Sequence, residues 1–275
     1  ATRTIEADSK FAIELKKRFG TKLIFSGPHA TTYPEEVLEF ADFVIRREYE
    51  LAVRDILQGK DPNDIMGLYP NAYREPLDVN DLPLPEDDDV SRLDYGIPGE
   101  PSSEYLEIQA YASRGCPLSC SFCVCGNISY ARPNWRPRDP HNVIHELDTL
   151  RSRYPQMEGI FFDEEVHNGS KKYMLDLTKA IREAGHDDLK YDVMCGLWPM
   201  DEEVLESMRM AGYYMVRLGI ETAEDKAAGG MELGAKFNPD KLKRLLKFGT
   251  DIGIKFYGTF TFGGEDSTDK GDKQT

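Results

Sequence analysis

The stretch LEIQAYASRGCPLSCSFCVCG, residues 106–126, decides the fold of this chain. It begins with the pattern of a buried strand, residues 106–113, and passes directly into a loop that carries four cysteines within ten residues. Functional groups that follow a strand in this way are typical of parallel α/β proteins, in which the chemistry lies at the carboxyl ends of the strands.

Four further strand patterns follow this one, and a helical pattern precedes each of them. Apolar runs predict the strands, and apolar residues spaced by three and four predict the helices, several of which end at glycine. This strict βα order predicts an α/β fold built as a partial parallel (β/α) barrel. The expected strands are 106–113, 159–165, 190–197, 213–221 and 254–264, and the expected helices are 141–154, 171–185, 201–212 and 238–253.

The residues before this barrel form two regions of different character. Residues 1–60 alternate helix and strand patterns and predict a small α/β domain, with helices at 6–19, 34–40 and 48–58 and strands at 22–26 and 42–45. Residues 61–105 are rich in proline and include the acidic run EDDD at 86–89, so we expect a linker before the barrel at 106–275. Because the chain begins at Ala1 and ends in the polar stretch GEDSTDKGDKQT, we expect a section of a longer protein.

Composition excludes several classes of function. Acidic residues outnumber basic ones by 49 to 34, which gives a formal net charge of −15 and argues against a nucleic-acid partner. No apolar run approaches the roughly 18 residues of a membrane helix, and no signal-peptide pattern is present. We therefore expect a cytoplasmic protein without a membrane span.

The cysteines indicate a metal or cluster site. Cys116, Cys120 and Cys123 have the spacing CxxxCxxC, and thiolates suit iron–sulfur clusters or zinc. Three thiolates on one loop can hold three irons of a four-iron cluster and leave the fourth iron open to a ligand. The alternative is a structural zinc, with Cys125 as a fourth ligand. Cys195 has the pattern of a core residue.

The CxxxCxxC loop after a first barrel strand, with Phe122 before its last cysteine, resembles the radical S-adenosylmethionine (SAM) enzymes, and the resemblance extends over residues 106–265. It implies a [4Fe-4S] cluster on the three cysteines and SAM beside it. Phe122 would pack against the cofactor, and Asp163 and Glu164 of the DEE sequence at 163–165 would contact its amino group. It also implies cofactor contacts from Arg217, from Glu221 of GIET, and from Gly263, Gly264 and Glu265 of GTFTFGGE.

Residues 26–50, SGPHATTYPEEVLEFADFVIRREYE, resemble the second half of the cobalamin-binding domain that precedes many such barrels. The resemblance implies cobalamin contacts from Gly27, Pro28 and His29, although Ser26 stands where the family usually has glycine. Residues 1–60 would then be the C-terminal half of a Rossmann-like cobalamin-binding domain. We expect His29 to lie in a turn beside Gly27 and Pro28, and a loop histidine bonded to backbone is the alternative to a cobalt ligand.

The resemblance implies an enzyme that cleaves SAM reductively and transfers a methyl group, with cobalamin, to an unreactive centre. Its substrate would be a small molecule or natural product, and flavodoxin or ferredoxin would supply electrons. A radical SAM cyclase or rearrangement enzyme without methyl transfer is one alternative. A zinc-stabilised, non-catalytic binding module and a barrel that retains the fold without activity are two others.

Overall fold

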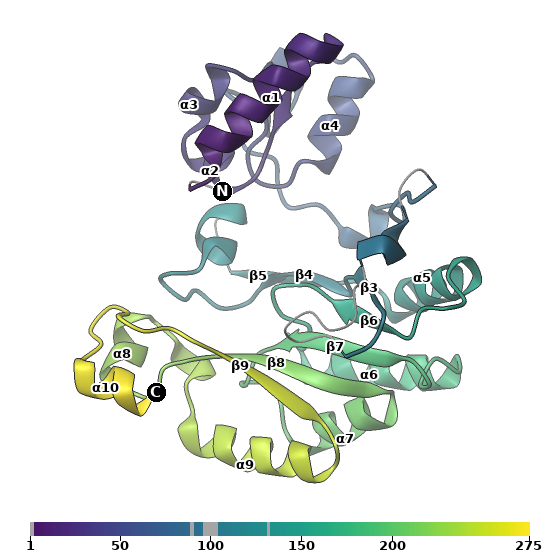
Figure 1. Ribbon diagram of the computed structural model, residues 1–275, viewed down its shortest axis with the longest axis vertical. Coiled ribbons are helices and arrows are strands. Elements are labelled where there is room, and N and C mark those ends of the chain that lie inside the picture. Colours follow the sequence, from purple (N-terminus) through teal and green to yellow (C-terminus); the bar gives the residue numbers. More distant parts are fainter. Residues whose placement is uncertain (1–2, 89–90, 96–103, 131–132) are drawn as a thin grey trace. The chain divides into compact units, whose positions relative to one another are not determined.

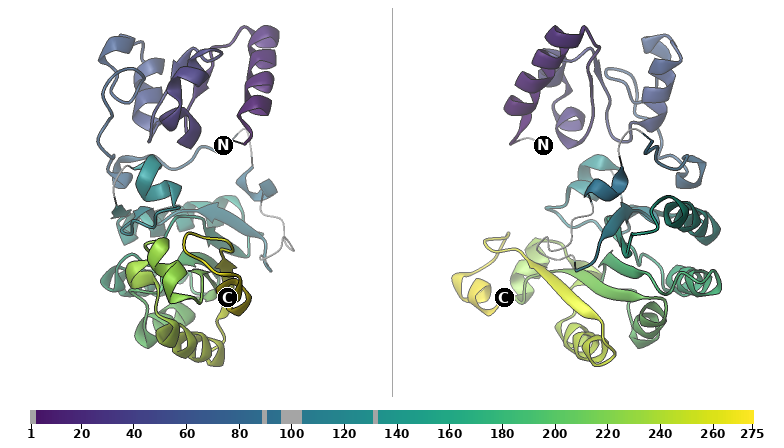
Figure 2. Two further views of the ribbon diagram at one scale, coloured as in Figure 1. Left: turned by 90° about the vertical axis from the view of Figure 1, so that its left-hand side faces the viewer. Right: turned by 45° about the vertical axis from the view of Figure 1, so that its right-hand side comes forward.

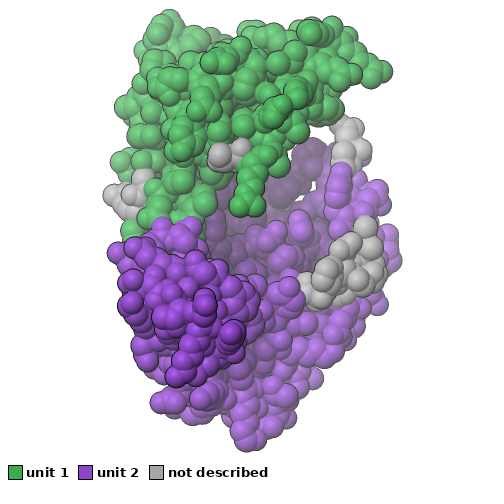
Figure 3. Space-filling view, turned by 60° about the vertical axis from the view of Figure 1, so that its left-hand side comes forward, with its two compact units in different colours: residues 1–77, 123–133 green, residues 78–122, 134–275 purple. Residues whose placement is uncertain are grey.

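The computed structural model describes residues 3–88, 91–95, 104–130 and 133–275. The chain divides into a larger unit, residues 78–122 and 134–275, and a smaller unit, residues 1–77 and 123–133 (Figure 3). Residues 89–90 and 96–103 of the expected linker, among them Asp89, Pro98 and Pro101, lie outside the described residues. The described part of this segment contains the short 3₁₀ helices η1 (Pro62–Asp64), η2 (Val79–Asp81) and η3 (Arg92–Tyr95).

The larger unit is built on a parallel sheet of five strands in the order β3-β6-β7-β8-β9. Each strand of this sheet pairs in parallel with the next one in that order, as in Ile108 with Ile160 and Ile160 with Tyr191. The predicted α/β class and the partial parallel barrel are thereby confirmed. The strands are β3 (Glu107–Ala110), β6 (Gly159–Phe162), β7 (Lys190–Cys195), β8 (Tyr213–Glu221) and β9 (Lys255–Phe260).

The helices that connect these strands lie side by side along one face of the sheet (Figures 1 and 2). Each begins at a polar residue whose side chain accepts a hydrogen bond from a backbone N–H of the first turn, which satisfies an otherwise unpaired donor. These capping residues are Asp139, Ser170, Asp201 and Asn238. The helices are α5 (Pro140–Arg153), α6 (Lys171–Glu183), α7 (Glu202–Met210) and α9 (Pro239–Asp251).

The two faces of the sheet differ in chemistry because successive strand residues point to opposite sides. Ile160, Val193 and Val216 belong to the apolar core with the helices and are fully buried. The alternate positions carry polar groups that bond to each other on the inner face. There the Tyr214 hydroxyl donates to Glu107 at 2.7 Å, and Arg217 pairs with Asp192.

The strand predicted at 106–113 is wrong in its second half. β3 ends at Ala110, and the chain then forms β4 (Ser113–Cys116), which pairs antiparallel with β5 (Asn134–Pro137). Side chains at the end of β6 bind the backbone of residues 112–115 and hold this segment in a separate hairpin.

The smaller unit contains two short parallel strands, β1 (Ile24–Phe25) and β2 (Phe43–Val44). Its helices are α1 (Ile5–Phe19), α2 (Pro28–Thr32), α3 (Pro34–Leu38), α4 (Glu50–Leu57) and the π-helix η4 (Cys125–Ser129). The expected turn at His29 is wrong, because Pro28 starts α2 after Gly27, whose φ of 104° suits only glycine.

The polar stretch at residues 264–275 contains a short helix, α10. α10 (Asp269–Gln274) begins at Thr268, whose N–H and hydroxyl both donate to Glu224, the residue before α8 (Asp225–Gly230). Among the described helices, none has both the length and the apolar character required to cross a membrane.

Candidate functional site

The cysteine loop follows β4 of the separate β4–β5 hairpin. Cys116 is the last residue of β4 and is half-buried, whereas Cys120 is buried. Ser121 fixes the loop to α8, because its N–H donates to the Met231 carbonyl at 3.1 Å and its hydroxyl donates to the Gly230 carbonyl at 3.3 Å. Cys123, also half-buried, belongs to the smaller unit.

The remaining cysteines differ from these three. Cys195 lies in the apolar core, as predicted, and burial raises the pKa of its thiol well above the usual value, so the metal-binding thiolate form is disfavoured. Cys125 is buried in η4. All five cysteines are present as thiols rather than disulfides. Soft thiol donors on one short loop are the donor set that an iron–sulfur cluster requires, so the residues present fit such a group.

The three acids that follow β6 have separate environments. Asp163 is exposed, whereas Glu164 is 7% exposed and its carboxylate accepts hydrogen bonds from the N–H groups of Ala112, at 2.9 Å, and Ser113. Glu165 accepts from the N–H of Gly115 at 2.8 Å. Of the two acids predicted to contact a ligand, only Asp163 presents its carboxylate to solvent.

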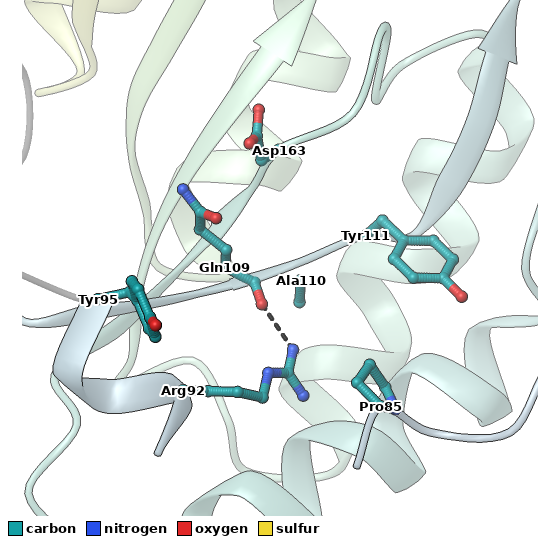
Figure 4. A pocket seen from close by; sticks show the side chains of 7 residues that line it. All are labelled: Pro85, Arg92, Tyr95, Gln109, Ala110, Tyr111 and Asp163. Atoms are coloured by element: carbon teal, nitrogen blue, oxygen red, sulfur yellow. Dashed lines mark hydrogen bonds between the residues drawn. The ribbon is translucent and has the colours of Figure 1, made fainter. Parts of the chain in front are cut away.

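Asp163 lines a pocket of about 310 Å³ at the carboxyl ends of β3 and β6. Figure 4 shows the Gln109 side chain extending toward Asp163, and Arg92 on the opposite side, where its guanidinium donates to the Gln109 carbonyl at 2.6 Å. Tyr95 and Tyr111 add aromatic surface to the lining. The pocket therefore combines hydrogen-bond donors, an exposed carboxylate and apolar rings.

Glu221 ends β8 with its backbone in the left-handed region, at a φ of 65°. Its carboxylate is bound by the Lys236 ammonium and by the Thr261 hydroxyl, the latter at 2.9 Å. The same ammonium lies 6.0 Å from the centre of the Phe122 ring. Lys236 thus connects two residues that the sequence predicted for the cofactor site, the first on β8 and the second in the cysteine loop.

Arg217 lies on the inner face of the sheet between the rings of Phe161 and Tyr257, at 4.4 and 5.4 Å from their centres. Its guanidinium binds both oxygens of Asp192. Burial disfavours the charged form of both groups and raises the pKa of Asp192, while the hydrogen bond to Asp192 raises the pKa of Arg217. Arg217 is therefore occupied by an internal ion pair.

The glycine stretch after β9 lies against α8 and α10. The Gly263 N–H donates to Asp272 at 2.8 Å, and a side-chain carbon at Gly264 would come within 2.9 Å of the Met231 sulfur. Glu265 is exposed. In the smaller unit, Gly27 and Pro28 start α2 and His29 is 5% exposed on it, while α2 contacts η4.

The sequence model of the radical SAM superfamily matches residues 111–271, more than half of the chain. The chain belongs to the radical SAM superfamily. Its cofactors are therefore a [4Fe-4S] cluster and SAM, as predicted, and it is an enzyme of the radical SAM class. This match favours the radical SAM enzyme over the alternative of a zinc-stabilised, non-catalytic binding module.

Among its relatives, an uncharacterized methyltransferase of Pyrococcus horikoshii is 26% identical over 265 residues, which cover 90% of this chain and 55% of that protein. The anaerobic magnesium-protoporphyrin IX monomethyl ester cyclase of Cereibacter sphaeroides is 28% identical over 218 residues, or 73% of this chain and 35% of that protein. The radical SAM methyltransferase TsrM of Kitasatospora setae shares the fold, with a TM-score of 0.79 and 18% identity over 98% of this chain and 55% of that one. The chain thus spans about half the length of the first of these relatives.

The sequence does not predict three residues that bind the candidate site residues or the segment before Cys116. His167 is fully buried, and its Nε2 lies 2.9 Å from the Tyr213 hydroxyl. Trp135 donates from its ring nitrogen to Ser113, and Lys236 holds Glu221. The spacing of His167 three residues after Glu164 is a weak signal for the first; nothing local in the sequence indicates the other two.

Proposed function

We propose that Cys116, Cys120 and Cys123 hold the [4Fe-4S] cluster and that the chain cleaves SAM reductively to start radical chemistry. The observation that carries this proposal is the CxxxCxxC spacing on the loop that follows β4, within the residues that match the radical SAM superfamily. When bound, the reduced cluster supplies one electron to SAM, which separates into methionine and a 5′-deoxyadenosyl radical. An external one-electron donor such as flavodoxin or ferredoxin is required.

The roles of the remaining residues follow from their exposure and contacts. Asp163 is the acceptor for the SAM amino group, because its carboxylate is exposed while that of Glu164 is occupied. A charge-assisted hydrogen bond of this kind contributes about 1.5–3 kcal/mol. Phe122, which is 48% exposed, is available to pack on the cofactor. Glu221, held by Lys236, contacts the cofactor. Gly263, Gly264 and Glu265 lie beside the adenine of SAM.

Arg217 takes part in the site indirectly. Since both oxygens of Asp192 bind its guanidinium, we assign it to the inner wall, where it orients Phe161 and Tyr257. These rings exclude water from the space in which a radical would react. The substrate is a small molecule.

The proposed reaction is cobalamin-dependent methyl transfer to an unreactive centre. The name of the Pyrococcus horikoshii relative and the shared fold with TsrM support methyl transfer. A second structure of TsrM contains cobalamin and a [4Fe-4S] cluster. We assign cobalamin contact to α2 of the smaller unit, through Gly27, Pro28 and His29.

The first experiment tests SAM cleavage. The chain is reconstituted with iron and sulfide without oxygen, SAM and a reductant are added, and 5′-deoxyadenosine is measured. We expect iron near four per chain and formation of 5′-deoxyadenosine. Cys120→Ala should lose both, and the matched variant Cys195→Ala should retain the iron. A colourless protein that takes up zinc in preference to iron would contradict the proposal.

A cyclase reaction without methyl transfer is the second candidate, because the Cereibacter sphaeroides relative is a cyclase. The two reactions differ in the fate of SAM, since only methyl transfer yields S-adenosylhomocysteine. We expect S-adenosylhomocysteine to form when cobalamin is added to the reconstituted, reduced chain. Formation of 5′-deoxyadenosine alone, with or without cobalamin, would favour the cyclase.

A further inference from the structure

Glu164 is the centre of a buried hydrogen-bond network that the proposed SAM chemistry does not use. One carboxylate oxygen accepts from the backbone N–H groups of Ala112 and Ser113, and the other is bonded to Nδ1 of His167. The second ring nitrogen of His167 lies 2.9 Å from the Tyr213 hydroxyl. The side chains of Glu164 and His167 are 1% and 0% exposed.

The backbone that Glu164 binds leads directly to the first cysteine of the motif. Residues 112 and 113 precede Cys116 by only a few residues, and Glu165 binds the N–H of Gly115, next to Cys116. Two adjacent carboxylates on the turn after β6 therefore hold three backbone amides of the segment that enters the cysteine loop.

Neighbouring side chains hold the same segment from other directions. The Tyr173 hydroxyl donates to the Ala112 carbonyl at 3.0 Å, and the Ser113 hydroxyl donates to the Val166 carbonyl at 3.0 Å. The Trp135 ring nitrogen donates to the Ser113 hydroxyl at 2.9 Å and to the Val166 carbonyl at 2.8 Å. The hairpin β4–β5 and the end of β6 are thus joined by polar contacts on both sides of residue 113.

A buried carboxylate is costly unless donors compensate it. Among the described residues, the donors that compensate Glu164 are the backbone of residues 112 and 113 and the ring of His167. His167 is itself fixed by Tyr213 and stacked on Phe162 at 4.8 Å. A group used only to bind a ligand would keep part of its hydrogen-bonding capacity exposed, as Asp163 does.

We propose that Glu164 and His167 are positioning residues that set the backbone of residues 112–115, and with it the Cys116 thiol, before the cluster is assembled. This inference rests on the proposed function for the identity of Cys116 as a ligand. It assigns Glu164 a role different from the contact with the SAM amino group that the sequence predicted. Ligand sites are most effective when surrounding hydrogen bonds orient their donors in this way.

The test begins with the cluster-free protein and amide hydrogen exchange. In Glu164→Gln we expect the amides of residues 112 and 113 to exchange at least about tenfold faster, because a neutral amide oxygen accepts more weakly than a carboxylate and because the amide can pair with His167 only in the other ring tautomer. After reconstitution, iron retention should fall and the electron paramagnetic resonance line shape of the reduced cluster should change. The SAM dissociation constant of the cluster-loaded fraction should stay within about twofold.

The matched control is Asp163→Asn, which alters the neighbouring exposed carboxylate. It should weaken SAM binding and leave the exchange of residues 112 and 113 unchanged. If Glu164→Gln does not fold, His167→Asn is used, which removes the link to Tyr213 and should accelerate the same amides to a smaller extent.

Unchanged exchange in both Glu164→Gln and His167→Asn would overturn the proposal, as would faster exchange with full iron retention and an unchanged spectrum. Weakened SAM binding without faster exchange would instead support the role predicted from the sequence, in which Glu164 contacts the SAM amino group. Because exchange is measured without cluster or SAM, it decides the positioning role even if no 5′-deoxyadenosine forms. Failure of SAM cleavage in the unsubstituted chain would contradict only the proposed function.

Discussion

Gly115, the residue before Cys116, is the position at which one added carbon should have the largest effect. Its φ is +88°, and a side-chain carbon there would lie 2.4 Å from the carbonyl oxygen of Asn134. Ordinary contact begins near 3.4 Å, so β4 and β5 would have to separate by about 1 Å.

The expected cost of Gly115→Ala has two parts. The left-handed backbone costs about 1–2 kcal/mol for a residue with a side chain. The clash adds about 1–3 kcal/mol, as overpacking does in a close-packed interior. Two other glycines separate these parts, because neither would meet an atom within 4 Å: Gly263 has a φ of +65°, and Gly229 lies in α8 without a positive φ.

The measurement is unfolding in urea followed by tryptophan fluorescence. Both tryptophans, Trp135 and Trp198, belong to the larger unit, so the signal reports on the unit that contains Gly115. We expect Gly115→Ala to lower the free energy of unfolding by about 2–5 kcal/mol. Gly263→Ala should lower it by about 1–2 kcal/mol, and Gly229→Ala should raise it by up to about 1 kcal/mol. If Gly115→Ala and Gly263→Ala cost the same, the close approach to Asn134 does not constrain the hairpin.

Three other substitutions test the electrostatics of the two units. Lys60, Arg74 and Arg54 hold the pKa of Asp55 at about 2, below its usual 3.8, so Asp55→Asn should cost about 2 kcal/mol at pH 7. Because the folded pKa is lowered, this difference should close as the pH falls from about 4 to 2 in urea unfolding followed by circular dichroism, and a constant difference would contradict the assignment. Arg217→Met should cost about 3–5 kcal/mol at pH 8 by leaving Asp192 buried without its partner, and less at pH 5, where that carboxyl is protonated more readily; no pH dependence would argue against the ion pair. Lys236→Met should weaken SAM binding with little change in iron content, because the ammonium binds Glu221 and lies near Phe122, and a loss of iron instead would place it with the cysteine ligands.

The sequence predicted the larger unit well because its signals are local. The strands and helices are short hydrophobic patterns bounded by glycine, by proline or by residues that cap the start of a helix, such as Asp201 and Asn238. The structure places their boundaries within a few residues. The cysteine spacing is equally local, and the superfamily match confirms the family it indicated.

The missed features depend on contacts between distant residues. β4 is a separate strand because Glu164, about 50 residues later, binds its backbone. The sequence placed Glu164 with the ligand-binding acids, since nothing in DEE tells a buried carboxylate from an exposed one. Lys236 reaches Glu221 across 15 residues. The sequence predicts a turn rather than the short helix α2, because five residues carry too little periodicity to identify a helix.

The hydrogen-bonded pairs on the inner face of the sheet affect where small molecules would bind as they enter and leave the larger unit. Glu107 binds Tyr214 and Asp192 binds Arg217 on this face, while the exposed carboxylate of Asp163 lines the pocket at the strand ends. A reactant would therefore gain polar contacts at this pocket, and its products would leave through the same opening. We expect the products, methionine and 5′-deoxyadenosine, to compete with SAM for this opening. Turnover should therefore slow as these products accumulate.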